Sequence, residues 1–274
     1  AGYSATNMNF VNYYLAKMKQ ASDAAGRRLL HYLDVHWHPE ARDSTNTRIC
    51  FGNPDKTDQA ASIARMQAPR SLWDPTYVEN SWVATACGGP ITLIQRLQAA
   101  INAYYPGTKI AVTEYNYGAI DHVSGGIAQA DVLGIFGREG VFAANLWHLG
   151  ETDDAFILAA FDMYRNADGE GLSFGDLSIA ASVSDVVSVS AYASKHTGIL
   201  YEIVLVLINK AEREVSVALR VRDRNEYGFA RVWRLSGEIP APRPDSNAPM
   251  NARNAGIVRL PAWSVSTLVL MPHL

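Results

Sequence analysis

The spacing of apolar residues changes along this chain, and the change limits the folds that it can adopt. In the first 165 residues, helix-period stretches such as 10–26 and 91–105 alternate with short apolar runs. These strand-like runs lie at 29–37, 109–115 and 141–147. Strands that alternate with helices in this way are typical of βα units, so this part predicts a parallel sheet covered by helices.

The last third of the chain has a different pattern. Val-rich segments such as "EVSVALRV" and "WSVSTLVLM" alternate apolar with polar residues, which predicts antiparallel strands packed as a β-sandwich. The Gly-rich segment 168–175 separates the two patterns, so we expect an α/β domain at 1–167 and an all-β domain at 168–274. The acidic residues around this segment do not have the spacing of a helix-loop-helix calcium loop, and we interpret it as a solvated linker.

Composition argues against several classes of partner. The net charge is −3 with both signs interspersed, which predicts neither nucleic-acid binding nor attraction to an anionic membrane. The longest aliphatic run, "IVLVLI", is far shorter than the roughly 20 residues that span a bilayer. Two cysteines, Cys50 and Cys87, do not make a disulfide framework; unpaired thiols are favoured, and a single disulfide stays open.

Glu114 ends the strand-like run "KIAVTEY". Side chains alternate along a strand, so Ile110, Val112 and Glu114 are expected to share one face. A strand that directs its isoleucine and valine into a barrel would carry the carboxylate to the carboxyl end of the sheet. Barrels of parallel strands keep their catalytic residues at that end.

Aromatic and histidine side chains are expected around the same rim. Trp147 ends the run 141–147, and His36 and His38 share a face of the stretch "LDVHWHPE" (33–40). The histidines lack a third zinc ligand within sequence reach, so we expect them to hydrogen-bond a substrate or Glu114. Three further aromatic residues, namely Trp82, Tyr115 and Tyr117, are also assigned to substrate binding.

A carboxylate among exposed aromatic rings is typical of a carbohydrate cleft. Aromatic faces stack on the apolar faces of pyranose rings, and a carboxylate can displace the leaving group of a glycoside. The segments "TEYNYG" (113–118) and "GGIAQADVLGIFGREGVFAANLW" (125–147) closely resemble glycoside hydrolase family 44, the endo-β-1,4-glucanases and xyloglucanases. The segments "DVHWHPEAR" (34–42) and "MQAPRSLWDPTYVENSW" (66–82) are similar to the same family.

The resemblance implies the carboxyl-terminal part of a (β/α)8 barrel followed by a β-sandwich. It also implies retaining hydrolysis of β-1,4-glucan with Glu114 as nucleophile, secretion from the cell, and no cofactor beyond an optional structural calcium. Family members carry their acid/base glutamate in an Asn-Glu pair of an earlier strand. The one such pair here, Asn225-Glu226, lies in the sandwich region, so we expect the acid/base and the rest of the barrel to come from another segment or chain.

Two readings without catalysis stay open. The chain could be a carbohydrate-binding module, or a structural fragment that completes another chain's fold. The context of Glu114 argues against the binding module, because a stacking surface has little use for a carboxylate at a strand end. The sequence does not decide the structural alternative.

Overall fold

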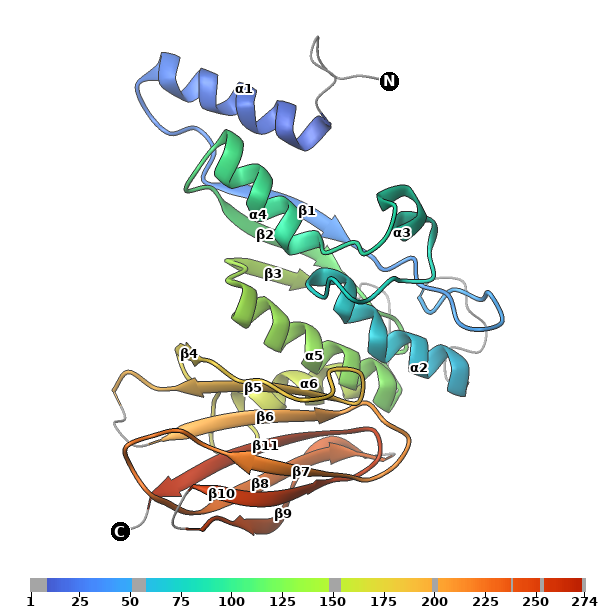
Figure 1. The fold of residues 1–274 in the computed structure, drawn as a ribbon, viewed down its shortest axis with the longest axis vertical. Helices are drawn as coiled ribbons and strands as arrows, with labels where there is room; N and C mark the ends of the chain where they lie inside the picture. Colours follow the sequence, from blue (N-terminus) through green and yellow to red (C-terminus); the bar gives the residue numbers. More distant parts are fainter. Residues whose placement is uncertain are drawn as a thin grey trace. The chain divides into compact units, whose positions relative to one another are not determined.

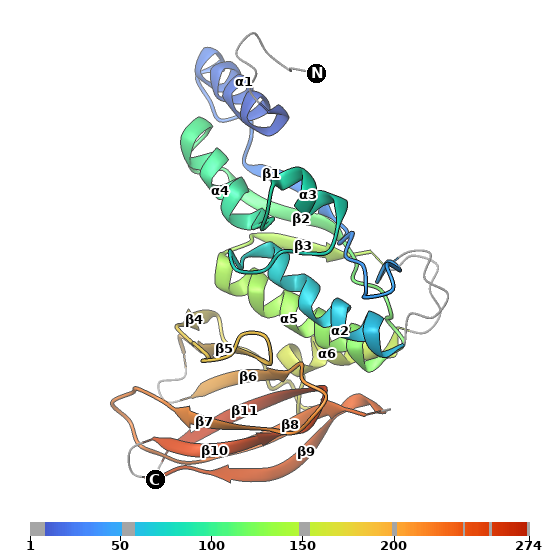
Figure 2. The ribbon, with the colours of Figure 1, turned by 45° about the vertical axis from the view of Figure 1, so that its right-hand side comes forward.

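The computed structural model describes residues 9–50, 58–147, 154–198, 202–237, 239–251 and 254–272 (Figures 1 and 2). The chain forms two compact units, each assembled from separate stretches of sequence. The first unit comprises Ala1–Glu40, Arg70–Asn116 and Glu139–Trp147, and the second comprises Ala41–Pro69, Tyr117–Arg138 and His148–Leu274. The expected domain boundary between residues 167 and 168 falls inside the second unit and stays a prediction.

The first unit is built on a three-stranded parallel sheet. Its strands are β1 (Tyr32–Trp37), β2 (Lys109–Tyr115) and β3 (Ala143–Leu146), in the order β1-β2-β3. The helices α1 (Phe10–Ala25), α3 (Trp82–Cys87) and α4 (Leu93–Tyr104) belong to the same unit, and the 3-10 helix η1 (Ala68–Leu72) leads into it. The alternation of strands and helices expected from the sequence is therefore confirmed here.

One face of this sheet is buried. The register places Leu33 beside Ile110 and Trp37 beside Tyr115, and all four side chains are less than 9% exposed. The helix α4 buries its own Ile94, Leu97 and Ile101. Between the buried residues of β1, Asp34 and His36 are exposed on the opposite face.

The second unit contains three helices and two antiparallel sheets. Its helices are α2 (Gln59–Gln67), α5 (Val123–Glu139, of which Glu139 belongs to the first unit) and α6 (Ala155–Arg165). Its strands are β4 (Leu177–Ile179), β5 (Val189–Lys195), β6 (Ile203–Asn209), β7 (Val215–Arg220), β8 (Tyr227–Ser236), β9 (Ile239–Pro249), β10 (Ala255–Leu260) and β11 (Ser264–Pro272). Six of them form a sheet in the order β4-β5-β6-β11-β8-β9, and β10 pairs with β7.

The strands β7 and β10 lie against the six-stranded sheet (Figure 2), and the two sheets share one hydrophobic core. Leu205 of β6 and Leu268 of β11 belong to the same buried cluster as Val258 and Leu260 of β10. The other face of the large sheet meets α6, where the Thr267 hydroxyl donates to the Met163 carbonyl at 2.6 Å. Every residue of β6 is buried, because helices cover one face and a second sheet covers the other. This double burial explains the unbroken apolar run "IVLVLI".

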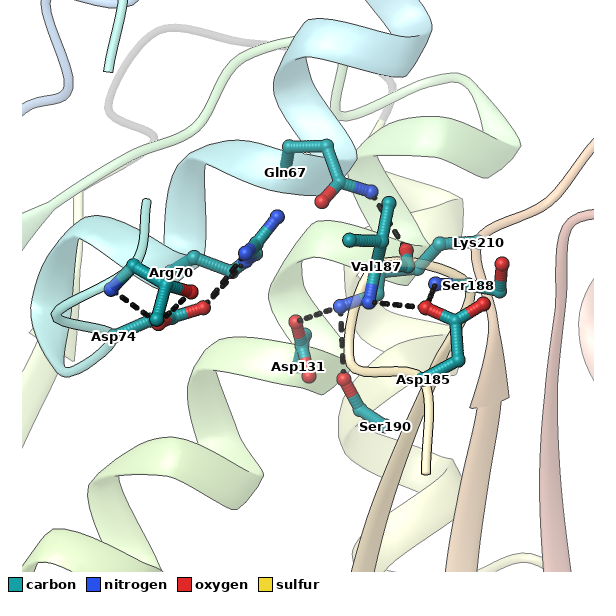
Figure 3. Close-up of polar contacts among 10 residues, drawn as sticks. Gln67, Arg70, Asp74, Asp131, Asp185, Val187, Ser188, Ser190 and Lys210 are labelled. Atoms are coloured by element: carbon teal, nitrogen blue, oxygen red, sulfur yellow. Dashed lines mark hydrogen bonds and ion pairs between the residues drawn. The ribbon is translucent and has the colours of Figure 1, made fainter. Parts of the chain in front are cut away.

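A buried ion pair joins α5 to the large sheet (Figure 3). The Lys210 Nζ lies 3.4 Å from Oδ2 of Asp131, and both side chains are 1% exposed. The same ammonium donates to the Ser190 hydroxyl at 2.9 Å, and the Tyr192 hydroxyl donates to Oδ1 of Asp131 at 2.6 Å. The lysine and the aspartate thus have further hydrogen bonds that offset part of the cost of burying charge.

Candidate active site

Glu114 lies near the carboxyl end of β2 and contacts two histidines. Its Oε1 is 2.8 Å from Nε2 of His38, and its Oε2 is 3.2 Å from Nδ1 of His36. The glutamate side chain is 27% exposed, His38 is 19% exposed and His36 is 57% exposed. Each carboxylate oxygen therefore has its own imidazole partner, which restricts rotation of the carboxylate while leaving it accessible.

A β-bulge directs Glu114 toward the histidines. The strand pairing places Val35 opposite Val112 but His36 opposite Glu114, so Thr113 is an extra residue on β2. The pairing with β3 is shifted at the same place, between Val112 and Tyr115. A bulge of this kind turns the following side chains to the other face of a sheet.

This bulge corrects the sequence-based prediction that Ile110, Val112 and Glu114 share a face. Without the bulge, Glu114 would lie with Val112, which is 1% exposed. With it, Glu114 lies opposite His36 on the exposed face. Glu114 does lie near the end of the strand, as expected. The regular alternation of side chains along β2, from which its face was predicted, is interrupted by the bulge.

The Asp34 side chain accepts hydrogen bonds from Thr113, the extra residue of the bulge. Its Oδ1 accepts from the Thr113 backbone N–H at 3.2 Å, and the Thr113 hydroxyl lies 2.8 Å from both carboxylate oxygens. An extra strand residue leaves backbone groups out of the ladder, and a side-chain acceptor can satisfy them. The sequence pattern alone did not predict this role for Asp34, although its place two residues before His36 is a usable signal.

Trp147 lies beside the His38–Glu114 pair. Its ring centroid is 5.5 Å from that of His38, with an interplanar angle of 69°, and its side chain is 40% exposed. Its backbone N–H donates to the Tyr115 carbonyl at 3.0 Å, and the Asn116 amide donates to its carbonyl at 2.7 Å. The backbone is thus held in place while the indole is available to a ligand.

Trp82 is the first residue of α3, and it is 66% exposed. The Ser81 hydroxyl caps this helix by accepting from the Ala84 N–H at 3.2 Å. An indole this exposed is suited to stacking against a sugar ring. Its assignment to substrate binding stays a prediction.

Tyr115 and Tyr117 do not lie at an exposed rim, contrary to the sequence-based expectation. Their exposed fractions are 1% and 3%, so neither ring presents a face to solvent. Tyr115 pairs with Trp37 on the buried side of the sheet, because the bulge shifts it to the face opposite Glu114. In the second unit, the buried Arg65 donates to the Tyr117 carbonyl at 3.1 Å. Both tyrosines are buried, and their assignment to substrate binding at an exposed rim does not agree with this burial.

Three further findings concern metal ligands, cysteines and membrane-spanning helices. Among the described residues, no group of three or more His, Cys, Asp or Glu side chains has the geometry of a metal site. Cys50 and Cys87 are both free thiols. None of the described helices has the length and hydropathy of a membrane span.

Comparisons with known proteins find similarity in sequence and in fold. The family model for glycoside hydrolase family 44 matches residues 3–41. Endoglucanase A of Paenibacillus lautus is 44% identical over 225 residues, which cover 82% of this chain and 32% of that protein.

Solved structures match over nearly the whole chain. A family 44 endoglucanase from Clostridium acetobutylium ATCC 824 has a TM-score of 0.92 and 36% identity, covering 96% of this chain and 51% of that one. A Paenibacillus polymyxa xyloglucanase of family 44, solved with xyloglucan, has a TM-score of 0.91 and 36% identity over the same shares. The chain therefore spans about half the length of these solved structures, and about a third of the Paenibacillus lautus protein.

The fold and the sequence matches together place this chain among the glycoside hydrolases. Within that class it belongs to family 44, since the family model and the structural matches agree on that family.

Proposed function

We propose that this chain carries the nucleophile of a retaining endo-β-1,4-glucanase, and that Glu114 is that nucleophile. The observation that carries the proposal is the placement of Glu114 at a strand end, with both oxygens held by His36 and His38. A nucleophilic carboxylate must present one oxygen to the anomeric carbon, and fixed hydrogen-bond partners reduce the freedom lost in reaching that orientation.

The proposed reaction has two steps. An oxygen of Glu114 forms a bond to the anomeric carbon while the glycosidic C–O bond breaks, and the leaving oxygen receives a proton from a second carboxylic acid. That second group then removes a proton from water, which attacks the same carbon and releases Glu114. Retention requires the two carboxyl groups to be about 5–5.5 Å apart.

We propose that the second carboxyl group belongs to a segment or chain outside the sequence described here. The three parallel strands would then be the carboxyl-terminal part of a (β/α)8 barrel, completed by that segment, and the two antiparallel sheets would form the attached β-sandwich. In support, Tyr32 and Phe142 of the first unit are 45% and 51% exposed and their rings stack at 4.6 Å. Large exposed apolar side chains beside a parallel sheet are suited to burial by further βα units.

The proposed substrate is a β-1,4-linked glucan such as cellulose or xyloglucan, with xylan-type polymers as weaker candidates. Trp147 would stack on a sugar next to the scissile bond, and Trp82 on a more distant one. A polymeric substrate fits an extracellular location. The two-carboxylate reaction needs no redox cofactor or catalytic metal, and it is compatible with a structural calcium.

Trapping of the covalent intermediate tests this proposal. A 2-deoxy-2-fluoro cello-oligosaccharide with a good leaving group should inactivate the complete enzyme, and peptide mass spectrometry should find the sugar on Glu114. Labelling of another carboxylate in an active enzyme would overturn the assignment. Binding of cello-oligosaccharides by the complete protein without hydrolysis would instead support the carbohydrate-binding alternative.

A further inference from the structure

Trp263 lies in the turn between β10 and β11, is partly exposed, and has two features that are unfavourable for stability. Its φ is 45°, in the left-handed region that bulky side chains rarely adopt. Its Nε1 is buried and, within the part of the chain that the structure describes, has no hydrogen-bond acceptor. A glycine would fill the same turn without either cost, so the indole needs another explanation. Strained positions of this kind cluster at ligand-binding sites.

The backbone around Trp263 is fixed by hydrogen bonds to the connection between β6 and β7. The Trp263 N–H donates to the Ala211 carbonyl at 3.1 Å. The amide of Asn209, a fully buried residue, donates to the Pro261 carbonyl at 2.7 Å and to the Arg213 carbonyl at 2.9 Å. These contacts join the two turns, so the position of the indole is set before any ligand binds.

The indole lines an open hollow of about 540 Å³. The other lining residues, which all belong to the second unit, are Gln59, Val123, Glu212, Gly237 and Ala262. They come from the first residues of α2 and α5 and from three connections between antiparallel strands. The volume lies within the range of about 300–1,000 Å³ that sites for small ligands occupy.

Two hydrogen-bonded polar side chains line the hollow together with the indole. The Gln59 amide donates to Oε1 of Glu212, and both residues are exposed. This bond uses a single N–H and a single lone pair, so both groups have capacity for further hydrogen bonds. The hydroxyl groups of a sugar donate and accept, and they can therefore pair with the amide as well as with the carboxylate.

The chemistry of the lining selects a neutral ring that carries hydroxyl groups. Because Nε1 is buried, any part of the Trp263 ring that a ligand reaches is carbon, which suits the apolar face of a pyranose. Glu212 disfavours an anion, and as the one carboxylate among the described lining residues it is too little for a metal ion. A purely apolar ligand would remove Gln59 and Glu212 from water without replacing their hydrogen bonds.

We propose that this hollow, the Trp263 site, is an accessory glucan-binding site. The indole stacks on one pyranose ring, and the Gln59–Glu212 pair binds hydroxyl groups of the sugar. The choice of a β-linked glucan rests on the proposed function, which supplies the polymer. The Trp263 site retains polymer on the protein and takes no part in bond cleavage.

Native electrophoresis of the complete enzyme through cold gels containing xyloglucan measures this retention. Trp263→Gly should weaken retention at least fivefold, and glycine adopts a φ of 45° freely, so the turn is preserved. Gln59→Ala and Glu212→Ala should each weaken it at least twofold, because each removes hydrogen bonds to the sugar. Turnover of an aryl cellobioside, which is too short to occupy a second site, should stay within twofold of the parent for all three variants.

Glu214→Ala is the matched control. Glu214 is exposed on the same connection as Glu212 and is not among the described residues that line the hollow, so this variant should be retained like the parent. Should Trp263→Gly lose stability, Glu212→Ala carries the test, since an exposed side chain leaves no cavity when it is removed.

Unchanged retention in Trp263→Gly and Glu212→Ala would overturn the proposal, as would an equal loss of turnover on the aryl cellobioside. The proposed function is read separately, from labelling of Glu114 by the fluoro-sugar. Labelling together with unchanged retention rejects only the Trp263 site. Retention that depends on Trp263 in a protein without turnover or labelling rejects the proposed hydrolysis and supports the Trp263 site.

Discussion

Nε2 of His38 lies 2.8 Å from Oε1 of Glu114, although the two residues are 76 positions apart in sequence. The contact forms because β1 and β2 are parallel neighbours whose carboxyl ends lie at the same edge of the sheet. His38 in turn contacts the Trp147 ring, which follows β3. The ends of three successive strands thus supply a carboxylate, its histidine partner and an exposed indole.

Glu114→Gln in the complete enzyme should abolish turnover while leaving oligosaccharide binding largely intact. The amide keeps the shape of the side chain but is not a nucleophile. Steady-state kinetics on carboxymethylcellulose and calorimetric binding of a cello-oligosaccharide check this outcome. A kcat within tenfold of the parent value would reject Glu114 as nucleophile.

The two histidines should differ in their importance. His38 has the shorter contact with Glu114 and is 19% exposed, whereas His36 is 57% exposed at 3.2 Å. Hydrogen bonds shielded from water are stronger than exposed ones. We expect His38→Gln to lower kcat at least tenfold and His36→Gln to lower it less than threefold, measured side by side. The reverse order would show that the exposed histidine controls the carboxylate.

Trp147→Ala should lower kcat/KM on soluble glucans at least tenfold, with part of the loss in kcat. A stacking platform contributes on the order of 0.5–1.5 kcal/mol beyond the area that it buries, and more when substrate distortion depends on it. Because the indole is 40% exposed, its removal should leave the melting temperature almost unchanged. A large drop in melting temperature with normal kinetics would instead identify Trp147 as a packing residue.

Lys210→Met should destabilise the protein by about 3–5 kcal/mol, because Asp131 would remain as a buried charge without its cation. Combining it with Asp131→Asn should recover much of this loss. Lys19→Met is the control, since the Lys19–Asp23 pair is 45% and 63% exposed and should contribute less than about 1 kcal/mol. Urea unfolding of the four proteins measures these differences. Equal effects at Lys19 and Lys210 would contradict the assigned importance of burial.

Titration of Glu79 should lower the free energy of unfolding as the pH rises above the ordinary pKa of a glutamate. Burial raises its pKa in the folded state, so the folded protein binds the proton more tightly than the unfolded chain. Stability then decreases between the unfolded-state pKa, about 4.3, and the raised folded-state pKa. Glu79→Gln removes this titration, so the unfolding free energy of the variant relative to the parent should increase with pH across that window. A constant difference from pH 4 to pH 8 would contradict the raised pKa.

Much of the local structure follows from the sequence. The run 109–115 is the strand β2 with the same ends, and the expected helix at 10–26 is α1, which ends at Gly26 in a left-handed conformation. These elements are set by the spacing of their own apolar residues and by a glycine that tolerates φ of 62°. Glu114, His36 and His38 were likewise assigned to one site by their positions near strand ends.

Tertiary structure decided the remainder, because it depends on neighbours that are distant in sequence. The stretch "IPAPRPDSNAP" does not resemble a strand, yet it forms β9. Among the described strands it lies at the edge of the sheet and pairs with β8 alone, and an edge strand can tolerate proline. The bulge at Thr113 depends on pairing with β1 and β3, and it moves Tyr115 inward while Glu114 faces the histidines. The sequence determined which residues could form the site, whereas strand pairing decided which of them meet, since a single extra residue reverses the face of every side chain after it.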